Sequence, residues 1–449
     1  MSARTPDPDG TAPETEAGAR GGAEGGRRAW LAGAALVAAV AAAIALAAAR
    51  GGSDAAALPA PAPAGEAPAV PAPGAAGLSS PGVDAPASNA LAATRGLAPA
   101  DTAFAALIRR LSGEGAYFDT DNLISNETSY LHVAARLRAL RGPRLAYVGV
   151  GPDQNFSYVA ALRPEAAFIL DIRRDNLLHH LLLKALMEAS PTRADYLAAL
   201  FGRPRPPARL RGESEPLAAL LDWVEATPSE PVSGGTPGTR DGGLPADLRA
   251  RIEGFGIDLS EEDLATIGRF HGEFVANGPG LRFRSHGRAP RWYYPTYREL
   301  LLERDEEGRQ ASYLAREEDY RFVRALQEAD GIVPVVGDFA GPHALRAIGE
   351  EVGRRGLRVG AFYTSNVEFY LDRQQGFERY AASVATLPAA PGGVIVRSYF
   401  HRGRRHAETR PGYASTQLLQ PIAAFVRAWR SGGIPSYRAL VHGSSGDGP

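Results

Sequence analysis

A glycine-rich turn between two short apolar runs constrains the fold of this chain more than any other feature. The first run, residues 145–148, ends in Gly149-Val-Gly151, and the second, residues 167–170, ends in Asp171. In parallel α/β proteins such a turn lets a ligand approach the backbone, and an acid about twenty residues on binds the ribose hydroxyls. The pattern therefore predicts a nucleoside site that uses Gly149, Gly151 and Asp171.

The same turn discriminates between nucleoside ligands. A dinucleotide fingerprint requires a third glycine, where this chain has Gln154, and Asp153 would repel a pyrophosphate at the helix N-terminus. S-adenosylmethionine carries an ammonium and a sulfonium but no phosphate, so the turn favours a class I methyltransferase-like site in which Asp153 and Asn155 also bind the cofactor. The alternative is a tight strand-to-helix turn without a ligand. Tyr147 favours this alternative, because such methyltransferases usually carry an acid there.

Alternating strands and helices extend this pattern along the chain. Strands are predicted at residues 145–148, 167–170, 332–338, 358–363 and 394–398, and helices at 102–111, 131–140, 155–162, 177–187, 191–201 and 342–355. Residues 202–244 predict a loop, and 245–320 predict several helices, one of them capped by Ser260 and Asp263. The alternation predicts an α/β, Rossmann-like parallel sheet. The gap of about 160 residues between strands two and three exceeds a normal crossover, so a large helical insertion is expected over residues 172–330.

Polar residues and glycines follow all five predicted strands, at the edge where such sheets bind ligands. These residues are Gly149, Gly151, Asp153, Asp171, Asp338, Ser365, Asn366, Glu368 and His401. Asp338 is expected to bind the adenine amino group, while Ser365, Asn366 and Glu368 would line the substrate pocket. Glu368 and His401 are the candidates for a general base. Each residue alone could simply close a turn, but together they indicate a site.

A dense polar cluster at residues 121–130 precedes the first strand. Ser125 or Asn126 could cap the helix predicted after it. The cluster nevertheless offers more hydrogen-bonding groups than one cap requires. It therefore also suggests a lid or ligand-contacting segment, with Asn122 and Asn126 in the substrate pocket.

Five sequence blocks resemble a known family. They are residues 121–131, 147–156, 168–176, 333–341 and 362–371. They resemble a family of uncharacterised bacterial proteins, some of them lipoproteins, with a Rossmann-like fold of the class I methyltransferase type. The resemblance covers approximately residues 100–400 and implies the fold, but no established reaction. The lipobox cysteine of the lipoproteins is absent from this chain.

The N-terminal part differs in composition and predicts a membrane location. We expect a disordered leader at residues 1–27, a transmembrane anchor or signal segment at 28–50, a Pro/Ala-rich linker at 51–98 and the Rossmann-like domain at 99–449. Residues 30–49 carry no charge, follow two arginines and could span a bilayer. This predicts a single-pass membrane protein with an extracytoplasmic domain, periplasmic or at the cell surface. A cleaved signal peptide or a degenerate twin-arginine signal is the alternative.

Composition argues against several classes of function. The net charge of −1 gives no overall field that would recruit nucleic acid. The absence of cysteine excludes disulfides, a thiolate nucleophile and cysteine-based zinc sites. The nine histidines form no metal-binding pattern, so no metal is expected.

These observations predict a membrane-tethered, S-adenosylmethionine-dependent methyltransferase-like protein of unknown substrate, in which a small-molecule ligand is expected. An extracytoplasmic domain would not normally meet this cofactor, so whether the domain is an enzyme stays open. The alternative function is a non-catalytic Rossmann-like envelope module that binds a small ligand or a protein partner.

Overall fold

Six strands form one sheet in the order β3-β2-β1-β4-β5-β6. The computed structural model describes residues 102–229, 243–286, 291, 293–401 and 405–443, all within the unit Asn89–Pro449. The strands are β1 (Leu145–Gly149), β2 (Ala166–Asp171), β3 (Ile332–Val336), β4 (Arg358–Ser365), β5 (Ala389–Phe400) and β6 (Ser415–Pro421). Strands β1 to β5 are parallel, and β6 runs antiparallel to β5. The predicted α/β class with a mostly parallel sheet is confirmed, and the strand order agrees with a Rossmann-like fold.

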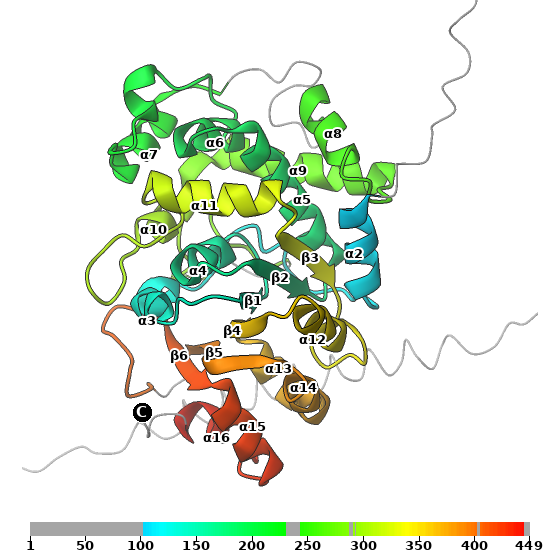
Figure 1. Cartoon of the computed structure of the whole chain (residues 1–449). Coiled ribbons are helices and arrows are strands. Elements are labelled where there is room, and N and C mark those ends of the chain that lie inside the picture. Colours follow the sequence, from blue (N-terminus) through cyan, green and yellow to red (C-terminus); the bar gives the residue numbers. More distant parts are fainter. Residues whose placement is uncertain (1–101, 230–242, 287–290, 292, 402–404, 444–449) are drawn as a thin grey trace, which may run out of the picture. The chain divides into compact units, whose positions relative to one another are not determined.

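The composition of the strands reflects their positions in the sheet. Every residue of β1 and β2 is buried, as expected for central parallel strands that helices cover on both faces. Strand β3 lies at one edge, which explains how it tolerates Pro334. In Figure 1 the helices that follow β2 gather beyond the β3 edge, and the last two helices lie near β6.

The helices have the following bounds. Before β3 they are α2 (Ala103–Leu111), η1 (Tyr130–Val133), α3 (Ala134–Ala139), α4 (Gln154–Leu162), α5 (Arg174–Ala189), α6 (Arg193–Leu200), η2 (Ala208–Arg211), α7 (Leu217–Ala226), α8 (Ala246–Glu253), α9 (Glu261–Asn277), η3 (Gly278–Gly280), α10 (Tyr297–Leu302) and α11 (Glu317–Glu328). After β3 they are α12 (Ala344–Arg354), α13 (Val367–Arg373), α14 (Phe377–Val384), α15 (Ile422–Arg430) and α16 (Tyr437–Gly443). The capping box predicted for α9 is present, between Ser260 and Asp263.

Several elements were not predicted, namely η2, α7, β6 and the helices α13, α14, α15 and α16. The stretch 202–244 is not simply a loop, because it contains η2 and α7; residues 230–242 lie outside the described part. Helix α7 buries Leu217, Leu220, Leu221 and Val224, which have helical spacing, but flanking prolines and glycines obscured it. Strand β6 was missed because its first residues are polar. Those residues are buried and serve as hydrogen-bond partners in the interior.

The predicted membrane location requires correction. Within the described residues, no helix combines the length and the apolar character that crossing a bilayer would need. This finding argues against the single-pass and signal-anchor assignments. The predicted leader, anchor and linker, including the span at residues 30–49, lie outside the described residues.

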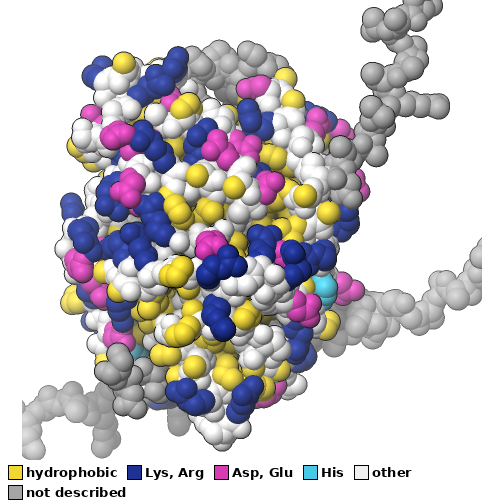
Figure 2. All heavy atoms as spheres, in the orientation of Figure 1, with side chains coloured by type: hydrophobic (Ala, Val, Ile, Leu, Met, Phe, Trp, Pro, Cys, Tyr) yellow, Lys and Arg dark blue, Asp and Glu magenta, His cyan; other side chains and the backbone are white. Residues whose placement is uncertain are grey.

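On the face drawn in Figure 2, acidic and basic side chains are interspersed.

Candidate functional site

A cavity of about 1010 Å³ lies at the carboxyl ends of the parallel strands. From β1 the chain passes to β2 and β3 on one side and then returns to β4 on the other side, so the strand order reverses between β1 and β4. Residues at or just after the end of each parallel strand line the cavity, namely Gly151, Asp171, Asp338, Ser365 and His401. Such a reversal point is where open α/β sheets bind ligands.

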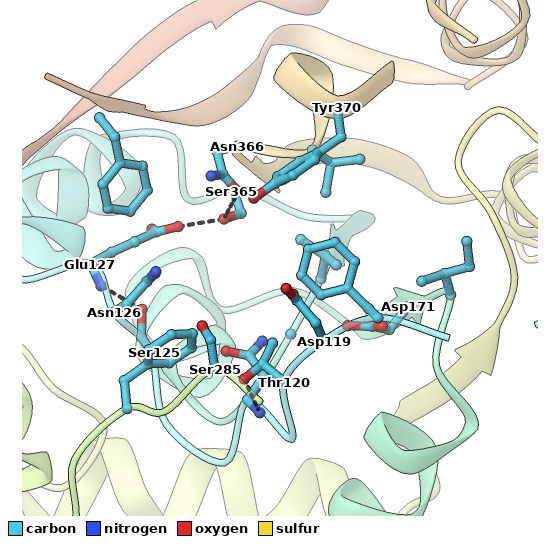
Figure 3. Close-up of a pocket in the computed structure, with 18 of the residues that line it drawn as sticks. Asp119, Thr120, Ser125, Asn126, Glu127, Asp171, Ser285, Ser365, Asn366 and Tyr370 are labelled. Carbon is cyan, nitrogen blue, oxygen red and sulfur yellow. Dashed lines mark hydrogen bonds between the residues drawn. The ribbon is translucent and has the colours of Figure 1, made fainter. Parts of the chain in front are cut away.

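The structure brings many of the predicted site residues together and separates four of them from the cavity. The lining includes Asn122, Asn126, Gly151, Asp171, Asp338, Ser365, Asn366 and His401. It does not include Gly149, Asp153, Asn155 or Glu368. Figure 3 shows Ser125, Asn126 and Glu127 on one side of the cavity, with the Glu127 side chain directed toward Ser365. The polar segment before β1 is thus part of the cavity wall.

Asn155 holds the glycine-rich turn together from inside. Its Nδ2 donates to the carbonyl oxygens of Val150 (2.9 Å) and Pro152 (2.7 Å), and its Oδ1 accepts from Tyr147 Oη at 2.7 Å. A Cβ on Gly149 would lie 2.0 Å from Asn155 Oδ1. The glycine therefore makes room for this internal contact, which corrects the prediction that Gly149 and Asn155 contact a ligand.

Asp153 points away from the cavity and into the helices that follow β2. It is 4% exposed, and its Oδ2 accepts hydrogen bonds from the hydroxyls of Tyr297 and Tyr313, the latter at 3.0 Å. Burial raises the pKa of Asp153 to about 6, although both tyrosine hydrogen bonds lower it. Asp153 therefore connects the turn to the helical region and is not a cofactor contact.

Glu368 is part of a buried ion pair and not a candidate base. Its carboxylate accepts from Arg397 Nε at 2.6 Å and Nη2 at 3.1 Å, and from Tyr380 Oη at 2.9 Å. Both Glu368 and Arg397 are fully buried. The first turn of α13 faces β5, so Glu368 meets the arginine of that strand instead of the cavity.

Asp171 lines the cavity as predicted, but it already has a partner. Arg173 donates to it from Nε (2.9 Å) and Nη2 (2.7 Å), a bidentate ion pair. Arg173 Nη1 also donates to the carbonyl oxygens of Thr120 (2.8 Å) and Asp121 (3.0 Å). The pair therefore fastens the segment before β1 to the tip of β2.

Glu127 is the centre of the polar network and was not singled out from the sequence. The side chain is 1% exposed and lines the cavity. Four neutral donors surround its carboxylate: Tyr363 Oη (2.7 Å), Ser365 Oγ, Ser398 Oγ and Gln417 Nε2 (3.0 Å). These donors come from β4, β5 and β6, which are distant in sequence, so local patterns gave no signal for the network.

Two cavity residues other than glycine have left-handed backbone conformations. The φ angle is +52° at both Asn122 and Ser365. Asparagine tolerates this conformation, but it is uncommon for serine. Strain of this kind concentrates at functional sites. At Ser365 it accompanies the hydrogen bond from the side-chain hydroxyl to Glu127.

His401 and Asp338 complete the polar part of the wall. Burial, followed by the charges of Arg405 and His406, lowers the pKa of His401, so its imidazole is neutral near pH 7. The Nε2 atom lies 3.3 Å from Thr416 Oγ1, and Nδ1 has no partner in the part of the chain that the structure describes. Asp338 uses Oδ1 to accept from the Ala340 backbone N–H at 2.9 Å.

Aromatic side chains form much of the remaining wall. Phe118 and Tyr370 pack edge to face with their ring centroids 5.4 Å apart. Tyr293 and Tyr294 also line the cavity, whereas Tyr297 lies in the core beside Asp153. Among the described residues, no group of His, Asp or Glu side chains has an arrangement that would hold a metal ion.

A model described as a domain of unknown function (DUF7790) matches residues 123–204 and 284–432, more than half of the chain. The chain belongs to this family. The matched residues of DUF7790 include all six strands and both ends of the Glu127 network. No curated protein matches the sequence.

Proposed function

We propose that the cavity binds an adenosyl ligand, with S-adenosylmethionine as the leading candidate, and that the protein is methyltransferase-like. The observation that carries this proposal is the position of the cavity. It lies at the carboxyl ends of five parallel strands, where the strand order reverses between β1 and β4. Sheets of this kind bind nucleotides and nucleosides at that point.

The acids at the tips of β2 and β3 fit an adenosine. Oδ1 of Asp171 accepts from both the Nε and the backbone N–H of Arg173, whereas among the described residues Oδ2 accepts one hydrogen bond, from Nη2. Oδ2 therefore retains an acceptor site for a ribose hydroxyl. Asp338 Oδ1 is used by the turn, and the other oxygen is available to the amino group of adenine. The cavity volume is at the upper end of the range for small-molecule sites, which leaves room for a second molecule beside the adenosine.

Bound there, S-adenosylmethionine would supply an electrophilic methyl group. The contribution of the chain would be to orient the acceptor and exclude water, which is sufficient for an in-line displacement. His401 is neutral, and its Nδ1 has no partner among the residues described, so it is the candidate to receive a proton from the acceptor.

Two finer features of the fold belong to the same proposal. We infer a methyltransferase-like sheet, and we interpret the helical segment between β2 and β3, residues 172–330, as an insertion. The interval that the DUF7790 model leaves unmatched, residues 205–283, supports an insertion, because it carries α7, α8 and α9.

A second candidate function is a module that binds a small ligand without catalysis. It is favoured because residues that a cofactor would normally contact form hydrogen bonds within the protein. Asn155 donates to a carbonyl oxygen of the turn and accepts from Tyr147, which occupies the position where methyltransferases usually carry an acid. Asp171 is paired with Arg173.

Calorimetric titration of the full chain with S-adenosylmethionine, S-adenosylhomocysteine and NAD tests the proposal. We expect micromolar binding of the two adenosyl sulfur compounds and none of NAD. Asp338→Asn should weaken binding by about 10- to 100-fold, the equivalent of a charge-assisted hydrogen bond. The control is Asp153→Asn, which removes an acid outside the cavity and should leave the affinity within about two-fold.

Absence of adenosyl binding to the folded chain would refute the proposal, as would equal effects of the two variants. Binding that is not accompanied by methyl transfer to any compound of a broad acceptor panel would favour the second candidate.

A further inference from the structure

We propose that Glu127 binds a positively charged group of the cavity ligand, so that the ligand is an ammonium or sulfonium compound. This inference deepens the proposed function and rests on it for the adenosyl part of the ligand. It concerns a residue in the segment before β1, outside the glycine-rich turn and the tip of β2.

Glu127 has no cationic partner in the part of the chain that the structure describes. Its four hydrogen-bond donors, three hydroxyls and one amide, are neutral. The exposed arginines that line the same cavity, Arg291 and Arg405, form no ion pair with it. A buried carboxylate without a counterion is costly, and hydrogen bonds offset only part of that cost.

Two other buried acids at this end of the sheet are each paired with an arginine, whereas Asp153, which lies outside the cavity, accepts from two tyrosine hydroxyls. Asp171 has Arg173, and Glu368 has Arg397. An arginine opposite Glu127 would therefore be an ordinary solution in this protein. Within the described ranges no arginine pairs with Glu127, which leaves its negative charge available to a ligand cation.

A second acceptor lies in the same network. Tyr363 Oη donates its only proton to Glu127, so the 2.6 Å contact between Gln154 and Tyr363 must be a hydrogen bond from Gln154 Nε2. This fixes the orientation of the amide. Gln154 Oε1 is buried and has no partner among the described residues, and Gln154 lines the cavity. An ammonium group has three N–H donors and would suit a carboxylate and a carbonyl oxygen together.

The backbone at Ser365 supports a preorganised arrangement. Its left-handed conformation accompanies the hydrogen bond from its hydroxyl to Glu127 Oε1. Oε2 accepts the other three hydrogen bonds, whereas Oε1 accepts this one. Oε1 is therefore the oxygen with capacity for a ligand.

The test compares three probes on the full chain and on Glu127→Gln. S-adenosylmethionine has both adenosine and cation, methylthioadenosine has adenosine without the cation, and S-methylmethionine has the cation without adenosine. Binding is measured by calorimetry, and by ligand-detected NMR where it is weak. We expect E127Q to weaken both cations at least about ten-fold and to change methylthioadenosine by less than about two-fold.

The matched control is Asp153→Asn, another buried acid, which accepts from the neutral hydroxyls of Tyr297 and Tyr313 but lies outside the cavity. It should leave the affinity for all three probes within about two-fold. Thermal unfolding supplies a second measurement. Without ligand, E127Q should melt no lower than the natural chain, since it removes an uncompensated charge, but it should lose the stabilisation that S-adenosylmethionine provides.

The outcomes separate the two proposals. If neither adenosine compound binds but S-methylmethionine binds and depends on Glu127, the adenosyl proposal fails and the cation inference stands. If neither cation binds the natural chain, or if E127Q binds cations normally, the cation inference is overturned. If E127Q does not fold, Glu127→Asp takes its place, because it keeps the negative charge but moves it away from the cavity by one methylene. The inference then requires that this variant selectively loses cation binding.

Discussion

The buried carboxyl of Asp153 makes stability depend on pH in a direction that can be stated in advance. Burial raises its pKa in the folded protein to about 6, against 3.8 when exposed. The folded state therefore holds the proton more tightly than the unfolded state. Stability from this group is fully present below about pH 4 and is lost as the pH rises through about 6. The shift of about two pKa units corresponds to about 3 kcal/mol.

Asp153→Asn removes the titration while keeping an oxygen that can accept from Tyr297 or Tyr313. The free energy of unfolding would be measured by urea denaturation from about pH 4 to about pH 7.5 for both proteins. The pH-dependent contributions of other titratable groups are the same in both proteins, so they largely cancel when the two free energies of unfolding are subtracted. We expect the stability of the variant, relative to the natural chain, to increase by about 3 kcal/mol across this range.

A control variant shifts the titration instead of removing it. Tyr313→Phe deletes a 3.0 Å hydrogen bond that lowers the pKa of Asp153, so the loss of stability should move to higher pH. A difference between D153N and the natural chain that stays constant within about 0.5 kcal/mol would refute the reasoning. So would a difference that decreases with pH, since that result would require an ionised, stabilising Asp153.

Two further predictions concern stability away from the cavity. Gly149→Ala should destabilise the protein by about 2 kcal/mol or more, because its Cβ would displace Asn155 from the turn. In the control Gly272→Ala, in α9, the added Cβ meets no atom within 4 Å, so this variant should be neutral or more stable by up to about 1 kcal/mol. Equal urea midpoints for the two variants would contradict this prediction. Glu368→Gln should cost about 3–5 kcal/mol in the same assay, because it leaves Arg397 buried and unpaired, and a loss below about 1 kcal/mol would show that the pair is not needed.

The strands and their carboxyl-end residues could be predicted because both are local features. Buried parallel strands read as continuous apolar runs, and the polar residue after each run must lie at one edge of the sheet. This reasoning correctly placed Asp171, Asp338, Ser365 and His401 around one cavity. Whether they bind a ligand stays a prediction.

The direction of a side chain could not be predicted where its partner is distant in sequence. Asp153 turns away from the cavity because Tyr297 and Tyr313, 144 and 160 residues later, donate to it. Glu127 becomes central through donors as distant as Gln417, 290 residues later. Neither relation leaves a periodic or short-range signal. The pairing of Asp171 with Arg173, two residues on, is local but was not predicted, because Asp171 was expected to bind the ribose hydroxyls.

The glycine-rich turn and the segment before β1 have different roles in the site. Asn155 and Asp153 use their polar atoms to hold the turn and to join it to the helical region. Glu127 and Asn126 line the cavity instead, and Glu127 has a charge that no described side chain neutralises. The turn that suggested a cofactor thus stabilises the cavity, while selectivity for a ligand is best sought in the segment before β1. A sheet of this architecture can therefore keep its binding position and change its ligand through residues outside the usual fingerprint.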